Sequence, residues 1–276
     1  MFGLEKLWRS RTGYVVIVLA VLFVLVAAAE VIKVVWPEPS GEVEYTDGGF
    51  LLDASHSDEG YVMVKHAGSD AGLKLRVTSG GMTYTYDING DGEYEVIPLQ
   101  LGSGNYTYSL YRNVKSTKYT KEAEMSITVE LADPDIPFVG PSQYVYYEQD
   151  TPAVLKSYEI CDGLDSDEEK VEAVVGYMTD NFTYDFERAK KQTTFYLGDA
   201  EGCFETRMGL CQDFAVVLAS MLRVQGIPTQ LVIGYCGDYY HAWNKVKIGD
   251  EYVLIDITAK INGADADFVY TEERIY

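Results

Sequence analysis

The amino-acid sequence predicts an α+β domain that follows an all-β, sandwich-like domain and one N-terminal transmembrane helix. An apolar run covers residues 14–29, hydrophobic residues then alternate with a period of two to about residue 131, and a helical period follows. We divide the chain into a cytoplasmic N-terminus (1–12), a transmembrane signal-anchor (13–36), a linker (37–45), a β-sandwich-like domain (46–135) and an α+β domain (136–276).

The N-terminal segment has the features of a membrane anchor. Lys6, Arg9 and Arg11 precede the apolar run, and basic residues favour the cytoplasmic side of the membrane, which places the later domains outside the cell. Extended through Trp36, the segment is long enough to cross a hydrocarbon core of ~30 Å. The alanines at 27–29 also resemble a signal-peptide cleavage site. A cleaved signal is therefore the alternative to the retained anchor that we favour.

The composition argues against some binding partners and ligands. The chain has 276 residues with 22 Lys and Arg against 43 Asp and Glu, a net charge of −21. Such acidity argues against nucleic acid, whose phosphates it would repel. Four cysteines in an exported chain suggest disulfides, and their spacing fits no zinc module. We expect no bound metal. The cysteines are Cys161, Cys203, Cys211 and Cys236.

Short alternating runs separated by glycine-rich breaks indicate the β-sandwich. Within it, "DINGDGEYEVIP" places Asp87, Asn89 and Asp91 at the spacing of an EF-hand calcium loop, but Pro98 stands where a bidentate glutamate belongs. Because Asn-Gly and Asp-Gly favour tight hairpins, we expect a turn between two strands and keep calcium as the alternative. The isolated histidines of this region are expected at the surface: His56 and His66.

The second half of the chain changes to helical spacing. "SDEEKVEAVVGYMTDNF" opens with a capping box of Ser166 and Glu169. A second helix is predicted to begin at Cys211, with an apolar stripe that ends before Gly226 and Pro228. Three strand-like segments follow, and we expect them to form an antiparallel meander: 229–235, 239–247 and 251–257.

Three residues of this half form a candidate catalytic set. Cys211 falls in the first turn of its helix, where free N–H groups and the dipole favour a thiolate. If Gly249 and Asp250 form a two-residue loop, His241 and Asp256 become diagonal neighbours on one face of a hairpin, about 7–8 Å apart at the backbone. A nucleophile, a base and a carboxylate that fixes the imidazole tautomer are what thiol chemistry needs. No cofactor is required.

These residues resemble the transglutaminase-like superfamily. "GLCQDFAVVLASMLRVQGIPTQLVIGY…YYHAWNKV…YVLIDIT" is similar to the family's series of Gly-x-Cys, Gly-Ile-Pro, Gly-Tyr, His-Ala-Trp and Asp-Pro-Thr, and "NFTYD" resembles exported clostridial members. The resemblance implies a papain-like fold with Cys211, His241 and Asp256 as the triad. Two departures are Ile257, which replaces the proline, and the pair 244–245 (Asn-Lys), which we expect to alter the rim of the cleft.

The resemblance implies an exported cysteine enzyme. Cys211 would form an acyl-thioester from an amide of a peptide or protein, cell-wall peptides included, and pass it to water or to another amine. Candidate substrate-binding or oxyanion-stabilising residues are Trp243, Tyr184 and Gln212, and we expect Gly209 to let substrate approach the backbone. At most one disulfide can join the other cysteines. The alternative is a non-catalytic cell-surface binding module that retains this fold.

Overall fold

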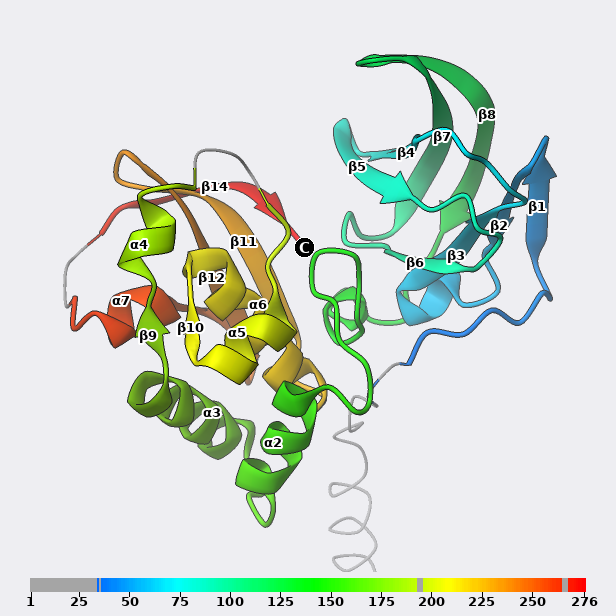
Figure 1. Ribbon diagram of the computed structural model, residues 1–276. Coiled ribbons are helices and arrows are strands. Elements are labelled where there is room, and N and C mark those ends of the chain that lie inside the picture. The colour runs from blue at the N-terminus through cyan, green and yellow to red at the C-terminus, as the bar shows by residue number, and fades with distance from the viewer. Residues whose placement is uncertain (1–33, 35, 193–195, 265–267) are drawn as a thin grey trace, which may run out of the picture. The chain divides into compact units, whose positions relative to one another are not determined.

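The computed structural model describes residues 34, 36–192, 196–264 and 268–276 (Figure 1). Almost all of the expected transmembrane segment (13–36) lies outside the described residues. Among the helices that are described, none combines the length and the apolar character needed to cross a membrane. Residues 34–276 form one compact unit, which contains a β-rich part followed by a mixed α/β part.

The β-rich part consists of two four-stranded antiparallel sheets and two short 3-10 turns. The elements are β1 (Glu44–Asp47), β2 (Phe50–Asp53), η1 (Ser57–Glu59), β3 (Tyr61–His66), β4 (Leu73–Ser79), β5 (Met82–Ile88), β6 (Glu95–Pro98), β7 (Gly104–Lys115), β8 (Lys118–Val129) and η2 (Ile136–Phe138). One sheet has the order β1-β2-β3-β6 and the other β5-β4-β7-β8. Alternate residues of β4, such as Leu73, Leu75 and Val77, are buried, because successive side chains of a strand point to opposite faces.

The segment with EF-hand spacing connects the two sheets. β5 pairs with β4 and β6 pairs with β3, so the expected turn links strands of two different sheets and does not close a hairpin. The polar residues satisfy the turn itself, since Glu95 accepts the Asn89 N–H (2.7 Å) and Asp91 accepts the Glu93 N–H (3.0 Å). In the described part of the chain, no group of three or more His, Cys, Asp or Glu side chains is arranged to hold a metal ion.

His66 is buried rather than at the surface. Its side chain is 3% exposed, and its Nε2 lies 3.1 Å from Oε1 of Glu122. Arg112 donates to both oxygens of the same carboxylate (2.7 and 2.6 Å). The hydrogen bond from Arg112 lowers the pKa of Glu122 most strongly. Burial acts to raise it, and the contact with His66 lowers it further, so that the pKa is about 2. A buried polar side chain of this kind is stable because it is hydrogen-bonded.

The mixed part places helices against a second antiparallel sheet. Its helices are α2 (Pro152–Cys161), α3 (Asp167–Asn181), α4 (Phe186–Ala189), α5 (Ala200–Thr206), α6 (Cys211–Arg223) and α7 (Ile257–Ile261). Its strands are β9 (Thr183–Tyr184), β10 (Met208–Gly209), β11 (Thr229–Cys236), β12 (Tyr239–Ile248), β13 (Glu251–Ile255) and β14 (Tyr270–Ile275). The sheet order is β13-β12-β11-β14, and β9 pairs with β10 in a separate short parallel ladder.

Helix α6 lies at the centre of this part. Every one of its residues after Cys211 is buried, and it contacts α2, α3, α5, β11 and β12. Gly226 follows its end with φ +76, a left-handed conformation that glycine adopts without a steric penalty. The predicted capping box of α3 is confirmed, since the Ser166 and Glu169 side chains each bond the other's backbone N–H.

A buried arginine links the end of α6 to the neighbouring segments. The guanidinium of Arg223 donates to the carbonyls of Thr229 (2.9 Å), Gly140 (2.7 Å) and Tyr276 (2.9 Å). Burial lowers the pKa of Arg223 to about 10. Three carbonyl acceptors make this buried cation tolerable, because a buried charge without hydrogen bonds is strongly destabilising.

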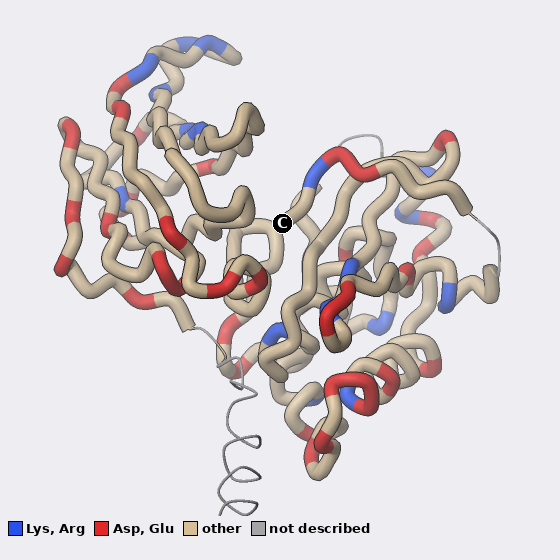
Figure 2. The backbone as a smooth tube through the Cα atoms, turned by 180° about the vertical axis from the view of Figure 1, so that it is seen from behind, with Lys and Arg blue, Asp and Glu red and all other residues tan. Residues whose placement is uncertain are grey.

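The two parts of residues 34–276 are in contact. The Tyr276 ring stacks on Tyr144 (centroids 3.7 Å apart) and meets Tyr84 edge-on (5.2 Å). Gln143 exchanges two hydrogen bonds with the backbone of Asp87 (3.1 and 2.6 Å). Figure 2 shows Asp and Glu spread over both parts, with a dense group on α3.

Candidate active site

Cys211 is the first residue of α6, and a buried carboxylate organises the turn in which it lies. Asp213, the third residue of the helix, is 0% exposed. It accepts hydrogen bonds from the N–H of Leu210 (2.8 Å), the N–H of Asp199 (3.0 Å) and Nη1 of Arg188 (2.7 Å). Because the first N–H groups of a helix have no intrahelical acceptor, this turn can offer backbone donors beside the Cys211 sulfur.

Gly209 has a packing role that differs from the one expected. A β-carbon at this position would lie 2.7 Å from Sγ of Cys203, 3.0 Å from Cβ of Asp213 and 3.2 Å from Cε1 of Phe214. Gly209 is itself buried. The glycine is therefore required for close packing of protein atoms, and the expectation that it admits substrate to the backbone is wrong.

The β12–β13 hairpin brings His241 and Asp256 together. Ile248 pairs with Glu251 across the predicted two-residue loop, and Asn244 pairs with Ile255. Nε2 of His241 lies 2.7 Å from Oδ2 of Asp256, and both side chains are largely buried. Since Nε2 is engaged by the carboxylate, Nδ1 is the ring nitrogen left for the Cys211 side chain, which lines the same cavity as His241.

Asp256 is held by the helix that follows it. It is the N-cap of α7, where Oδ1 accepts the N–H of Ala259 (3.0 Å). Ile257 takes the first helical position and is 2% exposed. Proline is favoured at that position but not required, so replacing the family's proline with isoleucine leaves the aspartate in place. The buried isoleucine contributes to the core instead.

A tyrosine that the sequence did not single out also binds this carboxylate. The Tyr270 hydroxyl donates to Oδ2 of Asp256 (2.9 Å). Tyr270 lies in β14, which pairs with β11 and has a register irregularity between Ile233 and Gly234. A β-carbon at Gly234 would lie 2.0 Å from the Thr271 carbonyl oxygen. The glycine of the Gly-Tyr motif is therefore what lets β14 approach closely enough to bring Tyr270 to Asp256.

The electrostatics of the pair favour a charged imidazole. Burial lowers the pKa of His241, but the hydrogen bonds and charges of Asp256 and Cys211 outweigh this effect and raise it to about 9. Burial acts to raise the pKa of Asp256. The hydrogen bond of Asp256 to His241, with further hydrogen bonds from Ala259 and Tyr270, outweighs burial, and the pKa is lowered overall. The arrangement therefore stabilises an imidazolium–carboxylate pair beside the thiol at neutral pH.

A cavity of about 310 Å³ opens at the thiol. Cys211 and His241 line it, together with two of the three residues expected to contact substrate, Tyr184 and Gln212. Trp243 does not line it. That indole is 1% exposed and stacks on the His241 ring with centroids 6.2 Å apart. Trp243 therefore orients the imidazole from behind and is not placed to contact substrate.

Asn244 and Lys245 were expected to alter the rim of the cleft. This expectation is wrong for Asn244. This side chain is 0% exposed, and its Nδ2 donates to the carbonyls of Ala215 in α6 (3.0 Å) and Gln230 in β11 (3.3 Å). It connects the cysteine helix to the strand that precedes the histidine strand. Lys245 forms a salt bridge with Glu272 on β14 (3.1 Å).

All four cysteines are free thiols. Cys203 and Cys161 are buried, and burial raises the pKa of both thiols. Burial also raises the pKa of Cys236, against a hydrogen bond from Tyr270 that lowers it. Cys211 is the cysteine that shares a cavity with a histidine.

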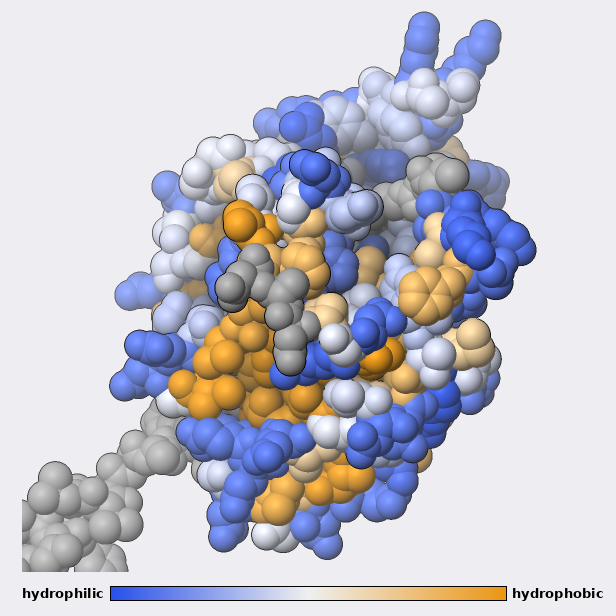
Figure 3. All heavy atoms as spheres, turned by 90° about the vertical axis from the view of Figure 1, so that its left-hand side faces the viewer, coloured by the Kyte–Doolittle hydropathy of each residue, from blue (hydrophilic) through white to orange (hydrophobic). Residues whose placement is uncertain are grey.

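Apolar surface adjoins the cavity. Figure 3 shows hydrophobic side chains gathered among hydrophilic ones on the face that carries α4 and α7. Two aromatic residues at the cavity are largely exposed: Tyr240, a lining residue, at 51%, and Phe186 at 60%, which meets the lining Tyr184 edge-on (5.0 Å). Exposed apolar surface of this kind is typical of interaction or ligand-binding sites.

Comparison with known proteins shows a family to which part of the chain is similar. Residues 156–257 match the model of the transglutaminase-like superfamily. The uncharacterized protein YebA of Bacillus subtilis is 40% identical over 81 residues, which are 28% of this chain and 11% of YebA. The chain thus spans only a small share of that relative.

Solved structures with similarity to the chain include a TGase and a candidate cysteine protease from Cytophaga hutchinsonii. The TGase is 26% identical, with a TM-score of 0.33 over 38% of this chain and 29% of the TGase. The Cytophaga protein is 16% identical, with a TM-score of 0.41 over 78% of this chain and 83% of its own. Both TM-scores are low, and the similarity to the superfamily rests on the sequence match.

Proposed function

We propose that this protein is a membrane-anchored extracellular cysteine enzyme that acts on amide bonds of peptides or proteins through an acyl-thioester. The observation that supports the proposal is that Cys211 and His241 line one cavity and that Asp256 is hydrogen-bonded to His241. The three residues come from a helix N-terminus, a strand and the N-cap of α7. The match of residues 156–257 to the superfamily agrees with this chemistry.

The first half of the reaction forms the thioester. The Cys211 thiolate attacks the amide carbonyl carbon, and the carbonyl oxygen takes up the negative charge. The N–H groups at the start of α6 would stabilise this oxyanion, since a helix N-terminus is a donor site for anions. The His241 imidazolium then gives its proton to the nitrogen, the C–N bond breaks, and the amine leaves.

The second half transfers the acyl group. A water molecule or a second amine enters, neutral His241 takes its proton, and the new nucleophile attacks the thioester carbon. The C–S bond breaks and Cys211 returns to the thiolate, with the proton now on His241. Asp256 holds the ring in one tautomer throughout. Hydrolysis and cross-linking differ only in the nucleophile that enters.

A substrate profile tests the enzyme proposal. The full chain is incubated with protein and cell-wall peptide mixtures, and mass spectrometry records new peptide termini, Gln-to-Glu conversion and isopeptide links. We expect at least one of these products with the natural chain and none with the Cys211→Ala chain. Identical product lists from the two chains would leave the non-catalytic binding module as the better account.

The membrane anchor is a separate proposal based on the apolar run and the basic residues before it. In a native host, the full chain should stay in the membrane fraction after a carbonate wash, and a protease added to intact cells should digest residues beyond 37. A secreted species that begins near Glu30 would show instead that the segment is a cleaved signal.

A further inference from the structure

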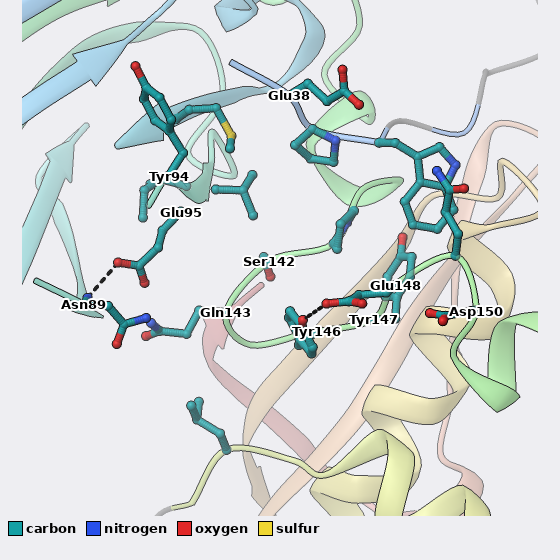
Figure 4. A pocket seen from close by; sticks show the side chains of 18 of the residues that line it. Glu38, Asn89, Tyr94, Glu95, Ser142, Gln143, Tyr146, Tyr147, Glu148 and Asp150 are labelled. Atoms are coloured by element: carbon teal, nitrogen blue, oxygen red, sulfur yellow. Dashed lines mark hydrogen bonds between the residues drawn. The ribbon is translucent and has the colours of Figure 1, made fainter. Parts of the chain in front are cut away.

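A second, larger cavity lies apart from the thiol. Its volume is about 800 Å³, and small-ligand sites have volumes of about 300–1,000 Å³. Residues of both parts of 34–276 line it. Figure 4 shows Tyr94 and Glu95 on one side of it, with Tyr146, Tyr147 and Glu148 on the other.

The charge of this cavity has one sign. Four carboxylates line it, those of Glu38, Glu95, Glu148 and Asp150, and no Lys, Arg or His side chain is among the lining residues. Among the described residues, none of these carboxylates forms a salt bridge. A cavity with charge of one sign concentrates ligands of the opposite sign. The ligand is therefore expected to be a cation.

Glu95 is the one carboxylate of the four that is not exposed. It is half-buried, and its one hydrogen bond among the described residues is to the Asn89 N–H. Burial is the main cause that raises the pKa of Glu95 to about 7, and the negative charges of Asp91 and Asp87 raise it further. A carboxylate held in this way is costly to ionise, and a cation bound beside it would remove that cost.

Aromatic rings supply the apolar part of the site. Trp36 packs edge-on against the buried Tyr147 (5.7 Å), and Tyr146, 61% exposed, donates its hydroxyl to Glu148. Lys65 already lies over the Tyr94 ring, 4.1 Å from its centre. Aromatic faces beside carboxylates suit ammonium or guanidinium groups on aliphatic stems.

The position of the cavity relates it to the peptide chemistry proposed above. Tyr196 lines the thiol cavity, and the next two residues, Leu197 and Gly198, line this one. A β-carbon at Gly198 would lie 2.8 Å from the carbonyl oxygen of Gln212, the residue after Cys211. One short stretch of backbone therefore borders both cavities, against the first turn of α6.

We propose that the second cavity binds a lysine- or arginine-bearing segment of the peptide substrate while the reacting amide lies at Cys211. The inference rests on the proposed function and specifies its substrate class as basic peptides. The acidic cavity then selects the substrate, and the thiol cavity carries out the reaction.

Direct binding tests this inference without turnover. An acetylated Gly-Lys repeat peptide is titrated against the full chain and followed by calorimetry and by Trp fluorescence. The comparison peptide carries acetyl-lysine, which keeps the stem but removes the charge. We expect the lysine peptide to bind at least tenfold more tightly, and we expect Trp36→Phe to remove most of the fluorescence change.

Three carboxylate variants locate the site. Glu95→Gln should raise Kd about tenfold or more, as expected for a lost charge-assisted hydrogen bond. Glu148→Gln, at an exposed position, should raise Kd about two- to fivefold. Glu130→Gln is the control, because Glu130 is exposed and does not line the cavity. Its Kd should be unchanged.

Two results would overturn the inference: equal binding of the charged and acetylated peptides, or equal Kd for Glu95→Gln, Glu148→Gln and Glu130→Gln. Turnover of an uncharged peptide amide is measured in parallel and should be the same in all three variants. If the natural chain shows this turnover but does not prefer the charged peptide, the second cavity alone is contradicted. Absence of any Cys211-dependent turnover contradicts the proposed function instead.

Discussion

Nε2 of His241 lies 2.7 Å from Oδ2 of Asp256, and this contact sets the charge of the imidazole next to Cys211. The histidine comes from the middle of a strand and the aspartate from the cap of the following helix. A two-residue loop between β12 and β13 fixes their register.

Activity should depend on pH through His241. Its pKa is raised to about 9, so the imidazolium that protonates the leaving amine is present at neutral pH and is lost as the pH rises through about 9. Asp256→Asn removes one of the two groups that raise this pKa, and the alkaline limb of the kcat profile should move to lower pH. An unchanged limb in this variant would show that Asp256 does not control the histidine.

Asp256→Asn should also lower kcat by ~10⁴, the size seen when the analogous residue is changed in serine enzymes. The asparagine can keep the shape of the site while holding the wrong imidazole tautomer. Steady-state kinetics at the pH optimum of each variant measures this loss. A value within a few-fold of the natural chain would contradict the role of Asp256.

The same linkage predicts a stability effect. A folded-state pKa above the unfolded value means that His241 stabilises the fold fully below about pH 6.5, and that this contribution disappears as pH rises through about 9. The difference in Tm between the natural chain and His241→Gln should therefore narrow across that interval. A constant difference from pH 6 to 10 would contradict it.

Tyr270→Phe should have a smaller effect than Asp256→Asn. It removes one hydrogen bond to Asp256 and leaves the triad intact, so we expect kcat to fall by up to about tenfold, as for one hydrogen bond to a charged group, with KM unchanged. Tyr239→Phe is the matched control, because Tyr239 is 81% exposed. Equal kcat values for the two variants would remove Tyr270 from the site.

Gly234→Ala should displace β14. Its methyl group would meet the Thr271 carbonyl oxygen at 2.0 Å, and overpacking of this kind costs about 1–3 kcal/mol in the free energy of unfolding. Gly176→Ala is the control: no atom lies within 4 Å of its added carbon, and alanine in a helix interior should stabilise by about 0.5–1 kcal/mol. Urea unfolding separates the two. Equal stabilities would contradict the close approach of β14.

The losses of turnover caused by replacing Cys211 and His241 should not be additive, because the two residues act as one unit. Cys211→Ala and His241→Ala should each abolish nearly all turnover, and the double variant should lose little more than either single one. Single-turnover assays compare the three. A double variant that loses the product of the two single effects would indicate independent roles.

Much of the site could be predicted because its signals are local. The cap of α3, the helical period after Cys211, and the loop at Gly249–Asp250 each depend on neighbouring residues. The loop then fixed the register that brings His241 toward Asp256. Short-range spacing is sufficient for such features.

The remaining features depend on residues far apart in the sequence. Strand β14 reads Tyr-Thr-Glu-Glu-Arg-Ile, is mostly exposed and lacks an alternating apolar pattern, so neither the strand nor the contact of Tyr270 with Asp256 could be predicted. The reasons for Gly209 and for the burial of Asn244 lie in atoms of α5, α6 and β11. The roles of these residues depend on tertiary packing, which local sequence patterns do not reveal.

The central claim is that His241 makes Cys211 a nucleophile, and selective alkylation tests it most directly. The full chain is treated with limiting iodoacetamide at pH 6, and peptide mass spectrometry gives the labelling rate of each cysteine. We predict that Cys211 is alkylated at least tenfold faster than Cys161, Cys203 and Cys236, and that His241→Ala removes this difference. Slow labelling of all four cysteines at similar rates would contradict the account.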